Sequence, residues 1–207
     1  MAPTSSAAFL EAVANRRSVY TISNESTVSD EKLKEILTTT LEETPSTFGS
    51  FTTRLVLLVK KDHEKLWDIT AEVLKAIVPA EGWEATKTKI DSFKAGYGTV
   101  LFYEDPENTK ALQSKFAIYA DRFPEWSAHT SAMHQYIVWT ALEAEGLGAS
   151  LQHYNPLIDA KVSAEWGIPL EWSLIAMLPF GKPTAPAGPK PTGMKKPIEE
   201  RLKVFGA

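Results

Sequence analysis

The sequence contains no cysteine, which excludes disulfide bonds, thiolate metal sites and a cysteine nucleophile. This absence is consistent with a reducing compartment. Histidine is also scarce, with four residues in a chain of 207. Two of them, His129 and His134, fall within one expected helix, but a spacing of five residues does not place them on one helical face as a metal pair requires. We therefore expect no metal site.

Strong charge and long apolar runs are missing as well. The formal net charge is -4, and no basic stripe with interleaved aromatic residues is present, so we expect no nucleic-acid partner. No run is long and apolar enough to cross a bilayer, and residues 1–13 lack the basic and continuous apolar regions of a signal peptide. The expected setting is therefore soluble and cytoplasmic, with the nucleus as a second compartment, and without a membrane partner.

The common catalytic motifs are absent too. No glycine-rich phosphate loop follows an expected strand, because the glycines at 96–98 and 146–148 lack the remaining glycines and the strand-to-helix order. This disfavours a Rossmann-type dinucleotide fold. There is no nucleophile elbow, and carboxylate pairs such as those at 42–43 and 199–200 are typical of solvated helix faces. The chemistry of the protein has to come from another source.

The apolar residues that are present follow the periods of helices and strands. This pattern predicts helices over residues 6–15, 29–41, 62–79 and 126–145, and strands over residues 54–61, 97–105 and 172–181. The proline at 106 stops the second strand in an acidic loop. Residues 181–197 are dense in proline and glycine and predict an extended arm. We expect one domain over residues 1–207, with 181–207 as a C-terminal arm that wraps a neighbouring subunit.

Two widely separated segments carry concentrated positive charge, RRSVY at residues 16–20 and KKPIEERLKVFG at residues 195–206. Each segment alone is typical of solvated charges on a surface. In a mildly acidic chain, however, cations beside a serine at a helix junction favour a bound anion. Together the two segments predict that both ends of the chain contact one phosphate.

Several blocks of the sequence resemble the nitroreductase-like flavoproteins, in the fungal and bacterial branch that includes the yeast fatty-acid-repression protein and copper-induced bacterial nitroreductases. The resemblance covers nearly the whole chain and is carried by FLEAVANRRSVY, PSTFGSFTTRLVLL, YGTVLFYED, MHQYIVWTALEAEGLGASLQHYNPLID and KKPIEERLKVFG. It implies an α+β fold, in which a central mixed, mainly antiparallel sheet is flanked by helices and the C-terminal arm wraps the dimer partner.

The same resemblance implies a homodimer with two FMN sites at its interface. One group of residues would contact the phosphate and ribityl chain, a second would reach the isoalloxazine ring from the partner subunit, and a third would pass beneath the ring. The first group comprises Arg16, Arg17, Ser18, Tyr20, Lys195, Lys196 and Arg201; the second comprises Pro45, Ser46, Thr47 and Ser50; and the third comprises Gln152, His153 and Tyr154. The backbone amides of residues 148–155 would lie near the flavin N5.

The activity that the resemblance implies is ping-pong hydride transfer. NADH or NADPH would reduce FMN at N5, and a small aromatic nitro compound or quinone would then take the electrons, with no side chain needed as a catalyst. Four aromatic residues, Phe51, Tyr119, Phe123 and Trp126, are candidates for the substrate pocket, although the last three are equally typical of a core. Two other functions remain open: a flavin-dependent sensor or regulatory ligand-binding dimer with incidental reductase activity, and a cofactor-free interaction module.

This chain departs from the family pattern in one segment. Relatives read PSAFNSQSSR where this chain reads PSTFGSFTTR, so Gly49 replaces an asparagine and Phe51 replaces a glutamine. Two amides that could bond the flavin ring are missing, and each lost hydrogen bond costs on the order of 1 kcal/mol. We expect weaker flavin binding or a shifted potential, with Phe51 as a new apolar wall for substrate.

Overall fold

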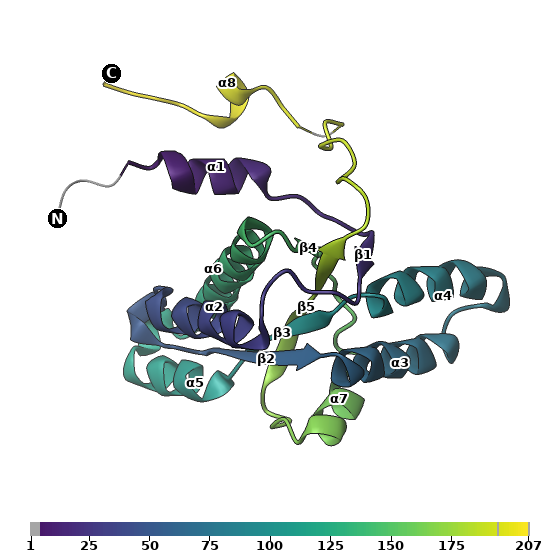
Figure 1. Cartoon of the computed structure of the whole chain (residues 1–207). Helices are drawn as coiled ribbons and strands as arrows, with labels where there is room; N and C mark the ends of the chain where they lie inside the picture. Colours follow the sequence, from purple (N-terminus) through teal and green to yellow (C-terminus); the bar gives the residue numbers. More distant parts are fainter. Residues whose placement is uncertain (1–4, 194, 207) are drawn as a thin grey trace.

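The computed structural model describes residues 5–193 and 195–206. Within them, a five-stranded sheet has the order β1-β5-β3-β2, and β4 pairs with β5 (Figure 1). The strands are β1 (Ile22–Ser23), β2 (Thr53–Val59), β3 (Gly98–Glu104), β4 (Gly148–Ala149) and β5 (Ser173–Pro183). Each of these pairs is antiparallel, and the parallel component is an isolated bridge between Ser18 and Ala149. The predicted α+β class with a mainly antiparallel sheet is confirmed.

Helices cover both faces of the sheet (Figure 1). They are α1 (Ala7–Asn15), α2 (Asp30–Glu43), α3 (Lys61–Lys75), α4 (Ala80–Lys94), α5 (Pro106–Lys115), α6 (Phe123–Ala144), α7 (Asp159–Trp166) and α8 (Ile198–Arg201), with short 3-10 turns η1 (Thr47–Gly49) and η2 (Ala117–Tyr119). The buried cores lie on opposite faces, one with α3, α4 and α7 and the other with α2 and α6.

Strand β3 lies between the two cores and is buried along its whole length. Successive side chains of a strand point to opposite faces. Accordingly, Leu101 and Tyr103 pack in the core beneath α3 and α4, while Val100 and Phe102 pack in the core beneath α2 and α6. This two-sided burial explains the nearly continuous apolar sequence of the strand.

The structure corrects the expected loop after β3. Asp105 is the N-cap of α5, and its side chain accepts a hydrogen bond from the amide of Glu107 at 3.0 Å. Pro106 stops the strand, as predicted, but its fixed backbone angle also suits the first turn of a helix. Helices α4 and α7 were likewise not predicted, because few of their residues are buried and the apolar period is weak.

Strand β5 continues two residues beyond the predicted strand end at residue 181. Lys182 pairs with Ser23 and Pro183 pairs with Ile22, so the partner strand β1 extends the ladder. Residues 181–183 therefore belong to the sheet rather than to the predicted extended arm. Proline is tolerated here because it occupies the end of the strand. The extended segment begins at residue 184.

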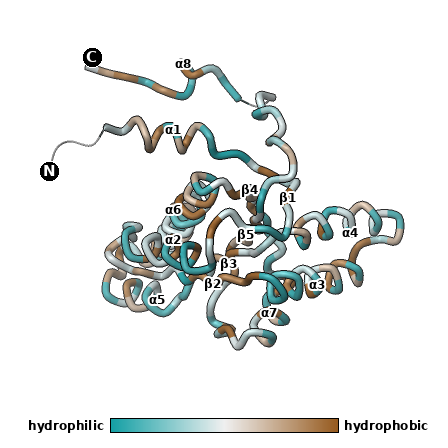
Figure 2. The backbone as a smooth tube through the Cα atoms, viewed as in Figure 1, coloured by the Kyte–Doolittle hydropathy of each residue, from teal (hydrophilic) through white to brown (hydrophobic). Residues whose placement is uncertain are grey.

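Apolar residues gather outside the core at both ends of the described chain (Figure 2). Helix α1 has no buried residue, and Phe9 and Leu10 on it are exposed. Beyond α8, Val204 and Phe205 are exposed as well. Both segments stand away from the sheet (Figure 1). In the part of the chain that the structure describes, no helix has the length and apolarity needed to span a bilayer.

A buried histidine makes the stability of the fold depend on pH. His63 is fully buried, its Nε2 donates to the Lys94 carbonyl at 3.2 Å, and its Nδ1 lies 2.8 Å from the Thr99 hydroxyl. Burial lowers the pKa of His63 from 6.5 to about 4. Between these two pH values the unfolded chain binds a proton at His63 and the folded chain does not. The contribution of neutral His63 to the free energy of unfolding is therefore fully present above pH 6.5 and is lost as the pH falls toward 4.

We expect the free energy of unfolding to drop by about 2–3 kcal/mol between pH 7 and pH 4.5 because of this group. Urea unfolding at both pH values would measure the drop. In His63→Gln this part of the pH dependence should disappear, whereas His129→Gln, at an exposed position, should retain it. An unchanged pH dependence in His63→Gln would contradict the assignment.

Candidate functional site

A cavity of 480 Å³ brings the two ends of the chain together, and we call it the anion cavity. Its polar lining comprises Arg16, Arg17, Ser18, Tyr20, Lys190 and Lys195. Five of these six residues were predicted from the sequence; Lys190 was not. The cavity therefore joins the first cationic segment to the C-terminal segment, as the anion hypothesis requires.

The backbone of residues 16–19 is fixed between α1 and β4. Helix α1 ends at Asn15, and Arg16 leaves the helical conformation with ψ 126°. Ser18 then bridges Ala149, and the amide of Val19 donates to the Ala149 carbonyl at 2.9 Å. Residues 16–19, which we call the arginine turn, are thus held in place by hydrogen bonds to β4 rather than by bonds within the turn.

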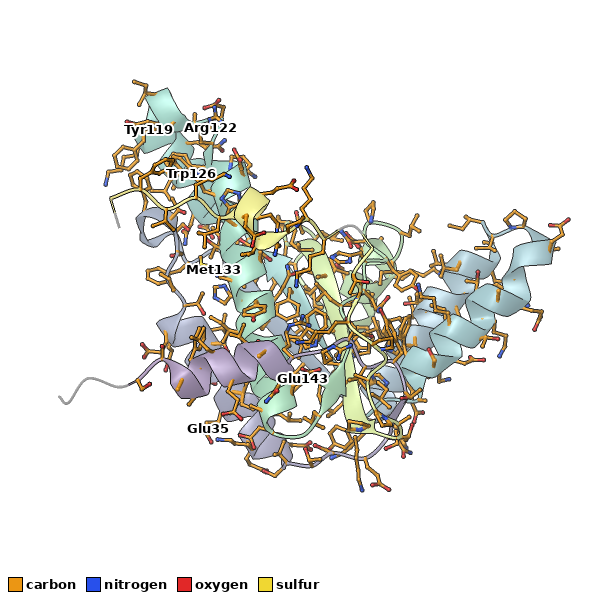
Figure 3. All side chains as sticks on the ribbon, turned by 90° about the horizontal axis from the view of Figure 1, so that it is seen from above. Glu35, Tyr119, Arg122, Trp126, Met133 and Glu143 are labelled. Carbon is orange, nitrogen blue, oxygen red and sulfur yellow. The ribbon has the colours of Figure 1, made fainter. Side chains whose placement is uncertain are left out.

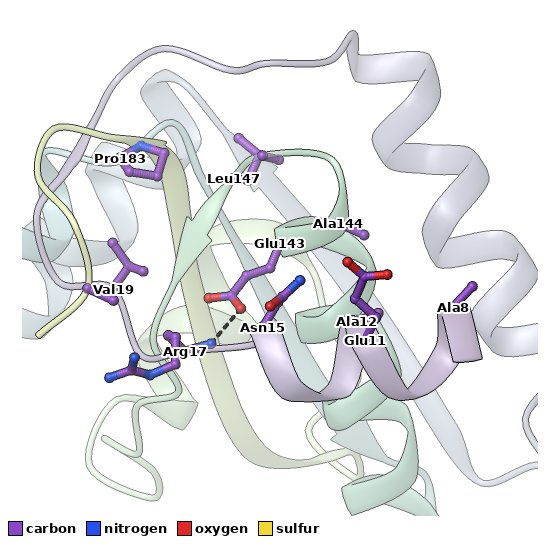
Figure 4. Close-up of a pocket in the computed structure, with 12 residues that line it drawn as sticks. Ala8, Glu11, Ala12, Asn15, Arg17, Val19, Glu143, Ala144, Leu147 and Pro183 are labelled. Atoms are coloured by element: carbon purple, nitrogen blue, oxygen red, sulfur yellow. Dashed lines mark hydrogen bonds between the residues drawn. The ribbon is translucent and has the colours of Figure 1, made fainter. Parts of the chain in front are cut away.

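The two arginines are held by α6. The Arg16 guanidinium lies 4.3 Å from the ring centroid of Trp139, a cation–π contact, and its Nη1 is buried without a hydrogen-bond partner among the described residues. The amide of Arg17 donates to the Glu143 carboxylate at 2.5 Å (Figure 4). The Arg17 side chain points away from Glu143 and donates to the Gly188 carbonyl.

The C-terminal segment contributes unevenly to the anion cavity. Lys195 lines it, and Lys190 anchors the segment by donating to the Ala14 carbonyl at 2.8 Å. Lys196 instead pairs with Glu200 at 3.3 Å on an exposed surface, and Arg201 is also exposed. Neither of these two predicted phosphate ligands lines the cavity. The sequence offers one signal for the role of Lys190, the proline on each side of it, because proline stiffens the backbone and so fixes the position of the lysine between them.

Residues 150–152 run beside β5. The amide of Gln152 donates to the Met177 carbonyl at 2.7 Å, and that of Ser150 donates to Pro179 at 3.3 Å. Alternation along an extended chain turns the intervening amide of Leu151 to the other side. The Gln152 side chain is buried and donates to the Ser150 hydroxyl at 3.1 Å.

The next two predicted ring residues differ in surroundings. His153 is exposed. The Tyr154 ring packs edge-on against Trp67, with 5.9 Å between centroids, and belongs to the rim of the core beneath α3 and α4. Burial raises the pKa of Tyr154. In this chain His153 is therefore open to a ligand, whereas Tyr154 is engaged in packing.

The loop over residues 45–51, which contains the predicted ring-contacting residues 45–50 and the predicted substrate wall Phe51, adopts a strained backbone. Phe48, Gly49 and Phe51 have φ values of 55°, 62° and 44°. Asparagine and glycine are the residues that adopt this left-handed region most readily. Gly49 and the asparagine of the family pattern therefore satisfy the same backbone requirement, while Phe51 has no such preference.

Side-chain bonds hold this loop in place. The Ser46 hydroxyl accepts from the amide of Phe51 at 3.1 Å, and Asn108 donates to the Ser50 carbonyl at 2.7 Å. Pro45 precedes the turn, and Thr47 opens η1. The loop is positioned by the body of the subunit, but it does not line the anion cavity of the same chain.

Three of the predicted substrate aromatics lie together. Phe123 and Trp126 contact each other edge-on at 5.2 Å, and Tyr119 lies 6.2 Å from Trp126. Phe48, which was not predicted, belongs to the same cluster and stacks on Trp126 with 5.9 Å between the ring centroids. Phe51 is exposed outside this cluster. Figure 3 shows Tyr119 and Trp126 at one end of α6 and Glu143 toward the other.

Beneath the loop lies a second cavity of 230 Å³, lined in part by Thr44, Ser46, Phe51 and His134. His134 is buried, and its Nδ1 lies 2.9 Å from the Thr130 carbonyl. A carbonyl only accepts, so Nδ1 is the donor in this contact. The place of His134 beside this cavity was not predicted, because a helical period gives no signal for neighbours on other segments.

Within the residues that the structure describes, no group of three or more metal-ligating side chains converges. The arrangement instead combines a cationic cavity, a strained loop and an aromatic cluster. Such an arrangement can hold an anionic group at one end and flat rings at the other.

A family model for the Nitroreductase family matches residues 13–182 of this chain. The Saccharomyces cerevisiae protein HBN1 is 37% identical over 197 residues, covering 93% of this chain and 96% of HBN1. The nitroreductase FRM2 of the same yeast is 35% identical over 187 residues, covering 89% of this chain and 92% of FRM2.

Among solved structures, the nitroreductase CinD from Lactococcus lactis, in complex with nicotinic acid, has a TM-score of 0.86 and 44% sequence identity. The match covers 95% of this chain and 99% of CinD. CinD is also known in complex with chloramphenicol and with 4-nitrophenol.

Proposed function

The chain belongs to the nitroreductase family, and on this basis we propose that it is an FMN-dependent oxidoreductase. It uses NADH or NADPH to reduce small nitroaromatic or quinone acceptors. It works as a cytoplasmic homodimer with two FMN sites at the interface. The observation that carries the proposal is the anion cavity, in which Arg17 from the start of the chain and Lys195 from its end line one space.

The residues of the anion cavity fit a phosphate. Arg16 has a buried Nη1 without a partner among the described residues, which favours an acceptor from a ligand. The volume of 480 Å³ has room for a phosphate with part of a ribityl chain. Ser18 adds a hydroxyl on the same lining. Hydrogen bonds from guanidinium groups to phosphate are the strong, charge-assisted kind.

The proposed homodimer follows from distances within one chain. Trp126 and Glu143 lie 17 residues apart on α6, so at 1.5 Å per residue the aromatic cluster lies about 26 Å from the phosphate end. An FMN molecule does not span that length, so the loop over residues 45–51 serves the site of the partner subunit. Exposed Met133 and Ile137 in the middle of α6 provide an apolar contact surface.

When bound, FMN supplies the redox chemistry, a hydride taken from NADH or NADPH and passed in a ping-pong order to the acceptor. The residues of this chain bind and orient. Arg16, Arg17 and Lys195 hold the phosphate, and the segment over residues 151–153 supports the ring through the amide of Leu151, because the amide of Gln152 is bonded to Met177. The loop of the partner subunit covers the ring edge and limits access of water.

The aromatic cluster defines the class of acceptor. Phe48 is exposed and Trp126 is half-buried, so their flat apolar rings suit a planar ligand, while the buried Phe123 supports them from below. The complexes of CinD with chloramphenicol and 4-nitrophenol contain nitroaromatic molecules, and we extend this class of ligand to the present chain. The exposed Phe51 adds an apolar wall where the family pattern has a glutamine.

The test is the visible absorption spectrum of the purified protein, before and after denaturation, followed by FMN titration. We expect flavin bands, release of FMN on denaturation, and oxidation of NADH or NADPH coupled to reduction of 4-nitrophenol or a quinone. A colourless protein that does not take up FMN would overturn the proposal. Flavin binding with negligible turnover would instead favour the sensor or regulatory function.

A further inference from the structure

Where α6 packs against Arg16 and Arg17, three buried polar atoms have no partner in the described part of the chain. These atoms are Nη1 of Arg16, Nε1 of Trp139 and Oε1 of Glu143. Buried polar groups in native proteins are nearly always hydrogen-bonded, so three orphaned atoms around one contact between α6 and the arginines point to a missing ligand or a functional constraint.

Trp139 and Glu143 are four residues apart on α6 and therefore lie on one helical face. They contact two consecutive residues of the arginine turn, Arg16 and Arg17. Trp139 supports the guanidinium of Arg16 at 4.3 Å, and Glu143 accepts from the amide of Arg17 at 2.5 Å. This face of α6 thus fixes the direction of the Arg16 side chain through Trp139 and the position of the Arg17 backbone through Glu143.

We propose that Glu143 is a positioning residue of the anion cavity, which holds the Arg17 amide and competes with a bound phosphate for the charges of Arg16 and Arg17. This inference rests on the proposed function. One carboxylate oxygen binds the amide, and the other has no partner in the described structure. Protonation of Glu143 removes the competing charge without removing the oxygen that accepts from Arg17.

The electrostatics support this coupling. Burial raises the pKa of Glu143 to about 7, while the hydrogen bond from Arg17 and the charges of Arg16 and Arg17 act in the opposite direction. A phosphate dianion at the arginines would raise that pKa further, because like charges disfavour each other. Phosphate binding is therefore expected to be accompanied by proton uptake at Glu143, and affinity should fall as the pH rises.

Besides the two arginines, charged groups near Glu143 come from α1 and from the C-terminal segment. Glu11 on α1 lines a further cavity together with Arg17 and Glu143 (Figure 4). Lys190 and Lys195 of the C-terminal segment line the anion cavity with Tyr20. Among the described residues that line this further cavity and the anion cavity there is no histidine. Glu143 is therefore the group expected to titrate near neutral pH.

The experiment is FMN titration of flavin-depleted full-length protein between pH 7 and pH 9, read by quenching of flavin fluorescence. This range lies above the second pKa of a phosphate monoester, about 6. If phosphate raises the pKa of Glu143 by one unit, FMN affinity should fall about fivefold across the range. Glu143→Gln should lose this dependence and should bind FMN at pH 9 at least as tightly as the wild type.

Two controls isolate the effect. Glu11→Gln removes an exposed carboxylate near the same turn and should keep the wild-type dependence. Riboflavin, which lacks the phosphate, should show no dependence that Glu143→Gln removes. A Glu143→Gln variant that binds FMN more weakly by the same factor at every pH would overturn the inference, because that result indicates a purely structural role.

A second measurement needs no variant. Calorimetric titration of the wild type with FMN at pH 7.5, in two buffers of different ionisation enthalpy, counts the protons taken up. Net uptake supports the inference, and no uptake overturns it. If the wild type fails to bind FMN at all, the proposed function falls instead, so the two failures are distinguishable.

Discussion

Replacing Arg17 with alanine is expected to lower the affinity for FMN on the order of 100-fold while the fold stays intact. A charge-assisted hydrogen bond contributes about 1.5–3 kcal/mol, and loss of the guanidinium removes such contacts to the phosphate. The side chain also donates to the Gly188 carbonyl, so its loss releases part of the C-terminal segment that closes the cavity. The amide bond to Glu143 does not involve the side chain and is retained.

FMN titration together with far-ultraviolet circular dichroism would measure both parts of this expectation. Arg17→Lys, which keeps the charge but loses the planar fork, should fall between the wild type and alanine. The matched control is Arg122→Ala, because Arg122 is exposed at the opposite end of α6 and pairs with Glu125 on the surface. Unchanged FMN affinity in Arg17→Ala would contradict the assignment of the cavity.

The largest expected loss of stability comes from Gly181→Ala. A Cβ atom at this position would fall far inside contact distance of the Ser23 carbonyl oxygen and 3.1 Å from the amide nitrogen of Tyr97. Both neighbours are backbone atoms and cannot rotate away. Relief requires separation of β1 from β5, and overpacking of this kind costs about 3 kcal/mol or more.

Urea unfolding would measure this loss, with Gly188→Ala as the matched control. A Cβ atom at Gly188 meets no atom within 4 Å, so that variant should retain wild-type stability. Because β4 also pairs with Gly181, and Ala149 of β4 bridges Ser18, the same substitution should displace the arginine turn and weaken FMN binding. Wild-type stability in Gly181→Ala would contradict the close packing of β1 on β5.

Many helices and strands of this chain are predictable from the sequence because their signals are local. The serine before α2 caps that helix, with its hydroxyl accepting from the amide of Lys32 at 3.2 Å. The apolar run at residues 54–61 became β2 and the long period at 126–145 became α6. The loop predicted after Pro106 was wrong, because a proline that ends a strand can also occupy the first turn of a helix.

The candidate site was predicted in part, for a reason that the arginine turn illustrates. Clustered charge at residues 16–17 and 195–196 is visible in the sequence and indicated an anion. The contact between Arg17 and Glu143 joins residues 126 positions apart, and no periodicity encodes it. Lys190, Phe48 and His134 acquired their roles in the same way, from neighbours supplied by other elements.

The sequence by itself therefore determined the α+β class, the family resemblance, the strand and helix periods and the cationic character of both chain ends. Only the tertiary structure decided that Lys195 rather than Lys196 lines the anion cavity and that β5 continues to Pro183. It also decided that Trp139 and Glu143 of α6 contact the two arginines. The physical reason is that propensity and period depend on neighbours along the chain, whereas burial, orphaned polar atoms and shifted pKa values depend on which distant segments pack together.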